Sequence, residues 1–237
     1  CDKAEARDGE PRLVAGALGP TTKLLSLSPR VEDPGYRDVD FDEMAAAFKD
    51  QALGLIAGGA DLLLIETITD TLNTKAALWA IWEAFDETGA DLPIWLSATI
   101  TDKSGRTLSG QTVEAFWNSV RHARPWAVGL NCALGPDDMR PFLADLARVA
   151  ECPVAAYPNA GLPNAMGGYD ETPHSMEAHY AEWAKAGLVN ILGGCCGTTP
   201  DHIAHLKDAI EGVPPRLIPR GETKLRLAGL EPFTAPA

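Results

Sequence analysis

The sequence predicts an α/β fold built on a parallel β-sheet, and two observations support this prediction. Six short apolar runs alternate with six segments of helical period, which is the pattern of repeated βα units. Nearly every apolar run is followed directly by polar residues or glycine, and α/β proteins hold their chemistry at these strand ends. Strict alternation by itself allows either an open doubly wound sheet or a closed eight-stranded barrel.

Each βα unit has its own local signals. The apolar runs end near Ala17, Glu66, Thr99, Asn131, Tyr157 and Gly193. The helical segments that follow them span residues 42–57, 71–85, 112–121, 136–149, 175–185 and 200–210. In the last unit, the apolar run 188–192 predicts a buried strand, and the threonines before Pro200 predict a helix start.

The residues at the strand ends favour the barrel over the open sheet. In a barrel all strand ends converge on one face, whereas in an open sheet only those at the switch point meet. No GxGxxG or GxxxxGK[ST] motif follows a strand, so the sequence does not indicate a dinucleotide-binding site or a P-loop. We therefore expect a (β/α)8 TIM barrel. Only six of its eight units are found, and the opening "CDKAEARDGEPR" is typical of a helix end and a loop, so we expect the first two βα units to lie upstream of residue 1.

Composition excludes several classes of partner. The chain has 237 residues, 46% of them hydrophobic, which is enough for one large core. With a net charge of −13 and no basic stripe, it should bind no nucleic acid. No apolar run is long enough to cross a bilayer and there is no signal peptide, so we expect no membrane association and a cytoplasmic location. Five cysteines without disulfide-framework spacing indicate free or metal-bound thiols.

Three of the cysteines follow strands in glycine-rich loops. Cys132, Cys195 and Cys196 could place three thiolates around one ion. Three protein ligands with one vacant position are typical of catalytic zinc, and soft sulfur ligands select zinc over magnesium or calcium. The alternative for the adjacent pair is small buried packing residues or a vicinal disulfide. Cys152 precedes a strand, at the opposite end of the barrel, and Cys1 lies in the opening loop; neither is given a role.

Several strand-end motifs occur together in order. The segments "GLNCALGPDDMRPFL", "YPNAGLPNAMGGYDETP" and "NILGGCCGTTPDHI" resemble the homocysteine-binding zinc domain of cobalamin-dependent methionine synthase, within the wider homocysteine S-methyltransferase family. The resemblance runs from about residue 11 to the end of the chain. It implies a TIM barrel that holds zinc by Cys132, Cys195 and Cys196, which would also be the catalytic residues.

The resemblance also implies a reaction. Zinc lowers the pKa of the homocysteine thiol, and the resulting thiolate attacks the methyl group of methylcobalamin, which is remethylated from 5-methyltetrahydrofolate, to give methionine. Such a transfer needs no protein general base. The histidines are accordingly expected to be surface residues rather than ligands: His122, His174, His179, His202 and His205.

Five other residues are candidates for substrate binding. By resemblance, Glu66 holds the amino group of homocysteine; the alternative is that its carboxylate caps the helix that follows. Asn131 and Asn159 could supply amide hydrogen bonds. The backbone amides of Gly193 and Gly194 could bind the substrate carboxylate, because glycine permits close approach.

The tail bears on the domain organisation and the methyl donor. Residues 1–212 are assigned to the homocysteine-binding barrel, and residues 213–237 to a Pro-rich linker followed by the start of a folate-binding domain. No "DxHxxG" motif is present, so methylcobalamin should be held by another domain or protein, and cobalamin- and folate-binding modules are the expected partners. A stand-alone homocysteine methyltransferase using betaine or S-methylmethionine, a barrel lyase or aldolase, and a non-catalytic barrel fragment remain as alternatives.

Overall fold

A computed structural model describes residues 2–236 of the chain, and its centre is a six-stranded parallel sheet. The strands of this sheet are β1 (Ala15–Leu18), β2 (Leu62–Ile68), β3 (Ile94–Ala98), β4 (Ala127–Asn131), β5 (Val154–Tyr157) and β6 (Ile191–Leu192). The helices are α1 (Asp2–Asp8), α2 (Phe41–Ala57), α3 (Thr71–Thr88), α4 (Val113–Val120), η1 (Arg121–Ala123), α5 (Pro136–Val149), α6 (Pro173–Lys185) and α7 (Pro200–Ile210). The six predicted βα units are confirmed, and the predicted bounds of α5 and α7 match those observed.

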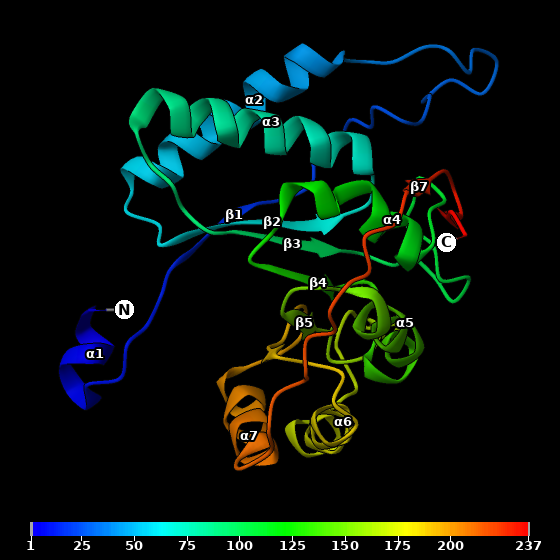
Figure 1. Ribbon diagram of the computed structural model, residues 1–237. Coiled ribbons are helices and arrows are strands. Elements are labelled where there is room, and N and C mark those ends of the chain that lie inside the picture. The colour runs from blue at the N-terminus through cyan, green and yellow to red at the C-terminus, as the bar shows by residue number, and fades with distance from the viewer. Residues whose placement is uncertain (1, 237) are drawn as a thin grey trace.

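The strands follow one another across the sheet in chain order, from β1 to β6. A doubly wound sheet reverses its strand order at a switch point, whereas the wall of a TIM barrel does not. Figure 1 shows the helices along one side of the sheet, from α2 and α3 beside the first strands to α6 and α7 beside the last. The architecture is therefore that of a partial TIM barrel. In residues 2–236 the sheet has two edges, β1 and β6, and closure of an eight-stranded ring remains a prediction.

Local capping fixes where the helices begin. Asp40 forms a capping box with Glu43 at the start of α2, and Thr172 forms one with Ser175 at the start of α6. The side chain of Asp70 accepts a hydrogen bond from the Leu72 amide at the start of α3. The apolar faces of the helices then pack on the sheet in one core, which includes fully buried Phe116, Tyr180 and Trp183.

The last strand is shorter than predicted. The run 188–192 predicts a strand of that length, but only Ile191 and Leu192 pair with β5. Asn190 explains the difference, because its side-chain oxygen accepts a hydrogen bond from the Val154 amide and its amide group donates to the Arg216 carbonyl. A side chain thus replaces a backbone carbonyl as the acceptor for the Val154 amide, while the Asn190 amide still donates to the Val154 carbonyl.

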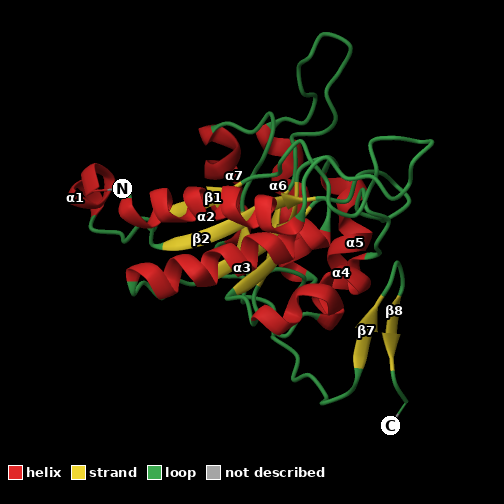
Figure 2. Ribbon diagram, turned by 90° about the horizontal axis from the view of Figure 1, so that it is seen from above, coloured by secondary structure: helices red, strands yellow, loops and turns green. Residues whose placement is uncertain are grey.

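The tail after α7 packs back onto the domain. Figure 1 shows it running from α7 past α5 toward α4, and Figure 2 shows its short hairpin beside α4. This antiparallel hairpin consists of β7 (Arg226–Ala228) and β8 (Pro232–Thr234). The carbonyl of Gly229 accepts a hydrogen bond from Gln111, and that of Leu230 accepts one from the Thr112 amide at the start of α4. The hairpin at the end of the segment assigned to a linker and a following domain is therefore in contact with the sheet domain.

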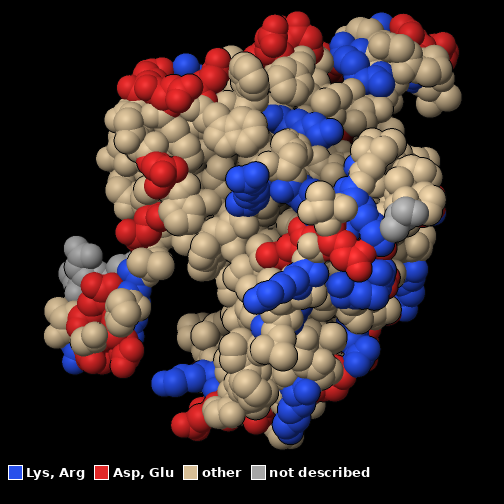
Figure 3. Space-filling model, in the orientation of Figure 1, with Lys and Arg blue, Asp and Glu red and all other residues tan. Residues whose placement is uncertain are grey.

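Acidic side chains gather on the part of the surface above α2 and α3, while Lys and Arg side chains elsewhere on this face are interspersed with acidic ones (Figure 3). None of the helices in the described part of the chain has the length and apolar character needed to cross a membrane.

Candidate active site

The site lies where β2, β4, β5 and β6 end. The first cysteine, Cys132, follows the last residue of β4 directly. Cys132 and Ala133 have φ angles of 60° and 53°, and Thr67 near the end of β2 has a φ of 56°. Left-handed conformations are uncommon for residues other than glycine and concentrate at functional sites. The chain thus turns sharply at the ends of β2 and β4, and the second of these turns carries Cys132.

Hydrogen bonds hold the loop with the two adjacent cysteines against the loop after β5. The Cys195 amide donates to the Pro158 carbonyl at 2.9 Å, and the Ala160 amide donates to the Cys196 carbonyl at 2.9 Å. The side-chain oxygen of Asn159 accepts a hydrogen bond of 3.1 Å from the Cys196 amide. These bonds fix the positions of both cysteines relative to β5.

The three predicted metal ligands come together. The Sγ atom of Cys196 lies 3.8 Å from that of Cys132 and 3.9 Å from that of Cys195, and all three sulfur atoms lie within 4.8 Å of one another. Three sulfurs bound tetrahedrally to zinc at about 2.3 Å lie about 3.8 Å apart. The donor type and the spacing therefore both fit a zinc ion, and Cys196 is the most exposed of the three residues.

The thiols in this cluster do not titrate alike. A hydrogen bond from the Cys195 thiol lowers the pKa of Cys132 to about 5, against the opposing effect of burial. The same interaction, followed by burial, raises the pKa of Cys195. The hydrogen bond from Cys195 therefore favours the thiolate form of Cys132, and the thiolate is the form in which a cysteine binds a metal.

The other cysteines lie apart from this cluster. Cys152 precedes β5, at the opposite end of the sheet, as predicted, and burial raises its pKa to about 11. A half-buried thiol with a raised pKa is a poor nucleophile and a poor metal ligand at neutral pH. Cys1 lies outside the described residues.

Glu66, near the end of β2, lines a small pocket. The pocket is lined by residues of the loop after β1, among them Gly19 and Thr21, and by the end of β2 and the start of α3. Burial raises the pKa of Glu66, the nearby Tyr157 hydroxyl opposes this, and the negative charge of Cys132 adds to the rise. Asp70 occupies the N-cap position of α3, so Glu66 is not the residue that caps this helix.

The two asparagines have different surroundings. Asn131 is fully buried, and its side chain accepts hydrogen bonds from the Thr67 amide and the Ser97 hydroxyl and donates one to the Thr67 hydroxyl. Asn131 therefore joins the ends of three strands. Asn159 is also buried, and it contacts the cysteine loop through the Cys196 amide.

The two predicted glycines also differ. The Gly193 amide donates to the Ala156 carbonyl, and the Gly193 carbonyl accepts from the Tyr180 hydroxyl, so this peptide unit is part of the sheet. A Cβ atom on Gly194 would lie 2.5 Å from the Thr198 side chain, so only glycine fits there. Among the described residues, the Gly194 amide has no hydrogen-bond acceptor and is the one of the two that remains able to bind a ligand.

Two residues of the site have features that their sequence patterns do not indicate. The hydroxyl group of Tyr157, at the end of β5, is buried without a hydrogen-bond partner in residues 2–236. Burial raises its pKa, as do the nearby charges of Glu66 and Cys195. His202 is buried rather than at the surface, so the surface prediction is wrong for this histidine. Its ring accepts a hydrogen bond from the Thr199 amide at the start of α7 and contacts the carbonyl of Glu171.

Comparisons with known proteins give a family match and a similar fold. Residues 1–210 match the sequence family described as homocysteine S-methyltransferase. The fold is similar to that of the homocysteine methyltransferase MmuM from Escherichia coli. For the apo form of that enzyme the TM-score is 0.64 at 23% sequence identity, over 88% of this chain and 67% of that one. For its metallated form the TM-score is 0.66 at 24% identity, over 87% of this chain and 65% of that one. The chain thus spans about two thirds of the length of MmuM.

Proposed function

Because the chain belongs to the homocysteine S-methyltransferase family, we propose that it transfers a methyl group to the sulfur of homocysteine. The observation that carries this proposal is the cluster of three cysteine sulfurs, 3.8 and 3.9 Å apart, contributed by two separate strand ends. Cys132, Cys195 and Cys196 are the residues that would hold zinc. When bound, zinc would lower the pKa of the substrate thiol, so that homocysteine reacts as a thiolate at neutral pH.

The reaction is a single displacement at carbon. The homocysteine sulfur forms a bond to the methyl carbon, the bond from that carbon to the donor breaks, and the donor leaves with the electron pair. The thiol proton is released to solvent when the substrate binds. The donors of this class carry a methyl group with a good leaving group, so no side chain has to act as a general base in the transfer.

The side chains around the cluster would orient the substrate. The Glu66 carboxylate is close enough to Cys132 to be affected by its charge, and it is suited to the homocysteine ammonium group. The free amide of Gly194 is suited to its carboxylate, and the unpartnered hydroxyl of Tyr157 could donate to the same group. Asn131 would act indirectly, because its hydrogen bonds to Thr67 and Ser97 hold the end of β2, which carries Glu66, against β3 and β4.

For the methyl donor we favour methylcobalamin carried by another module. The support is the tail, where "LRLAGLEPFTAPA" resembles the opening of a folate-binding domain, while the chain has no cobalamin motif. Betaine or S-methylmethionine is the alternative donor, and it would make the protein a self-sufficient methyltransferase.

A donor comparison tests the proposal. Purified zinc-loaded protein is incubated with homocysteine and each of methylcobalamin, betaine and S-methylmethionine, and methionine is quantified. We expect methionine from methylcobalamin without any folate, and none from the Cys195→Ala variant. A clear preference for betaine or S-methylmethionine would mean that this compound, and not methylcobalamin, is the methyl donor. The proposed transfer of a methyl group to homocysteine would stand. No methionine from any donor would leave a non-catalytic fragment as the better description of this chain.

A further inference from the structure

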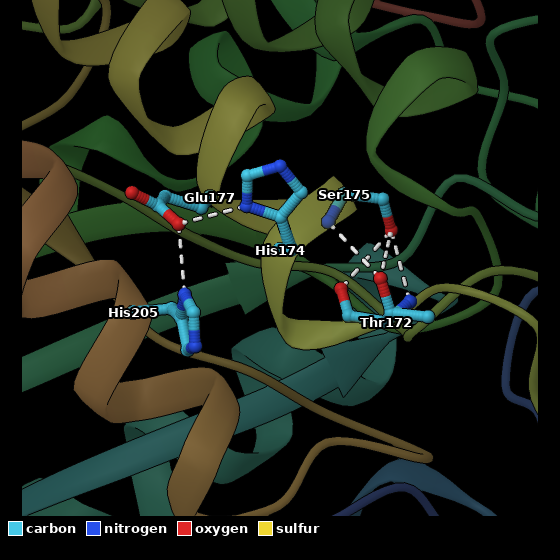
Figure 4. A network of polar contacts seen from close by, with 5 residues as sticks. All are labelled: Thr172, His174, Ser175, Glu177 and His205. Atoms are coloured by element: carbon cyan, nitrogen blue, oxygen red, sulfur yellow. Dashed lines mark hydrogen bonds and ion pairs between the residues drawn. The ribbon is translucent and has the colours of Figure 1, made fainter.

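A second group of metal-ligand residues lies on the outer helices, away from the cysteine cluster. His174 and Glu177 belong to the first turn of α6, and His205 belongs to α7. Figure 4 shows the Glu177 carboxylate between the two imidazole rings, with one oxygen facing a nitrogen of each. The Nδ1 atoms of His205 and His174 lie 2.7 and 3.4 Å from the same Glu177 oxygen, Oε2.

The three ligand atoms have the spacing of a metal site. Each residue offers one ligand atom, and these atoms all lie within 4.8 Å of one another. Nitrogen and oxygen ligands of a tetrahedral zinc ion, bound at about 2.0 to 2.2 Å, lie about 3.3 Å apart. The His174–Glu177 distance already has this value, and the His205–Glu177 distance reaches it by a shift of about half an ångström. The side chains of His205 and Glu177 are both partly exposed, so such a shift meets little resistance.

The charge of the cluster also suits a cation. The cluster contains one carboxylate, Glu177, whose Oε2 atom faces both imidazoles. The side chains of Glu177 and His205 are 32% and 42% exposed, which leaves an open path for an ion and room for water ligands. Two imidazoles and one carboxylate bind first-row transition metals such as zinc, and the imidazoles disfavour magnesium and calcium.

The position of the cluster gives a bound ion a structural consequence. His202, one turn before His205, already joins α7 to the segment before α6 through the Glu171 carbonyl. An ion held by His174, Glu177 and His205 would link α6 directly to α7, one turn further along α7 than His202. α7 begins four residues after Cys196, so this second contact would steady the helix that supports the cysteine loop.

We propose that His174, Glu177 and His205 form a second zinc-binding site, of His2Glu type, that links α6 to α7. It is independent of the cysteine cluster in its residues and its ligand chemistry. The thiolate site should fill first, because sulfur ligands bind zinc more tightly, and the His2Glu site should take the second equivalent.

Zinc binding to the tag-free 237-residue chain, measured by equilibrium dialysis after removal of metal by a chelator, tests the proposal. We expect two zinc equivalents for the wild type and one for His205→Ala, since loss of one of three ligands should weaken the site by about tenfold or more. Cys132→Ala should also bind one equivalent, at the second site. The matched control is His179→Ala, which removes a histidine of the same helix that pairs with Asp137 instead; it should keep two.

Cobalt substitution of the wild type separates the sites without relying on a cysteine variant. The first equivalent of Co²⁺ should give a thiolate charge-transfer band, and the second should add absorption without increasing that band. His205→Ala should remove only the second step, and an excess of Mg²⁺ should not compete with it. A wild type that binds one equivalent at saturation, or a His205→Ala variant that still binds two, would overturn the proposal. Neither result would affect the methyltransferase proposal, which rests on the cysteines.

Discussion

The Sγ atoms of Cys132 and Cys196 lie 3.8 Å apart, although 64 residues separate them in the chain. The parallel sheet produces this proximity, because it carries the ends of β4 and β6 to the same edge with β5 between them. The hydrogen bonds between the cysteine loop and the Pro158–Ala160 segment then set the distance. A metal site built in this way depends on the loops as much as on the ligands.

The first prediction concerns the tightly bound metal. We expect about one zinc per chain to remain after extensive dialysis, and almost none in Cys196→Ala, because two sulfur ligands cannot replace three. The zinc content is measured by elemental analysis of the purified proteins. Cys152→Ser is the matched control, since this half-buried thiol lies at the far end of the sheet and has a pKa of about 11. Full zinc retention in Cys196→Ala would show that the three-sulfur site is wrong.

The second prediction concerns the substrate ammonium group. Glu66→Gln should raise the KM for homocysteine roughly thirtyfold, which corresponds to the loss of about 2 kcal/mol from a charge-assisted hydrogen bond. Zinc content should not change, because Glu66 is not a metal ligand in this proposal. Steady-state kinetics and elemental analysis on the same preparation check both parts. An unchanged KM would remove Glu66 from the site.

A pH dependence follows from the same residue. The pKa of Glu66 is raised above its ordinary value of 4.5, mainly by burial, so its carboxylate is protonated at a higher pH than an exposed one. Homocysteine affinity should therefore fall as the pH drops through this raised value, and the fall should be absent in Glu66→Gln. The charged form also opposes folding at neutral pH, because the raised pKa means that the folded state favours the neutral form. Glu66→Gln should accordingly melt at a higher temperature than the wild type at pH 7, as measured by calorimetry.

The third prediction concerns Tyr157. Its buried hydroxyl has no partner among the described residues, so Tyr157→Phe should leave the free energy of unfolding unchanged or raise it by about 1 kcal/mol. If the hydroxyl binds homocysteine, as we propose, the same substitution should raise KM about tenfold. Denaturant unfolding and kinetics are compared on one preparation. A stability loss with unchanged KM would assign Tyr157 to the packing of the core.

The parts of the fold that follow from local patterns could be predicted from the sequence. Apolar runs, helical period and caps such as Thr199 before Pro200 act over a few residues, and they placed all six βα units. The order of the strands also followed, because βα units wind in one direction. The motif around Cys195 and Cys196 indicated ligands that the structure brings together with Cys132.

What the sequence could not indicate depends on contacts between distant segments. The short β6 results from Asn190 and Arg216, which are 26 residues apart. The Asn131 side chain forms hydrogen bonds with Thr67 and Ser97. These bonds depend on which strands lie side by side, and no local sequence pattern shows that. His202 shows the same limit, since a histidine in an amphipathic helix has no sequence signal for burial. A partner 31 residues away, the Glu171 carbonyl, is what permits it to be buried.

The last prediction concerns Arg216, in the segment predicted to be a linker. Its side chain is only 4% exposed, and its guanidinium donates hydrogen bonds to the carbonyls of Ala147, Ala150 and Cys152 at the end of α5 and before β5. Arg216→Ala would leave these buried carbonyl groups without donors, at a cost of about 1 to 3 kcal/mol for each that water cannot reach. We therefore expect the free energy of unfolding to fall by about 3 kcal/mol in denaturant titrations.

Arg220→Ala is the matched control, because Arg220 lies four residues further along the same segment and is exposed. It should change the stability by less than about 0.5 kcal/mol. Zinc content should be the same in both variants, since Arg216 contacts the end of the sheet opposite to the cysteines. Equal stability of the two variants would mean that residues 213–225 are a flexible linker after all. A large loss in Arg216→Ala alone would instead make Arg216 part of the folded domain and move the boundary of that domain beyond residue 212.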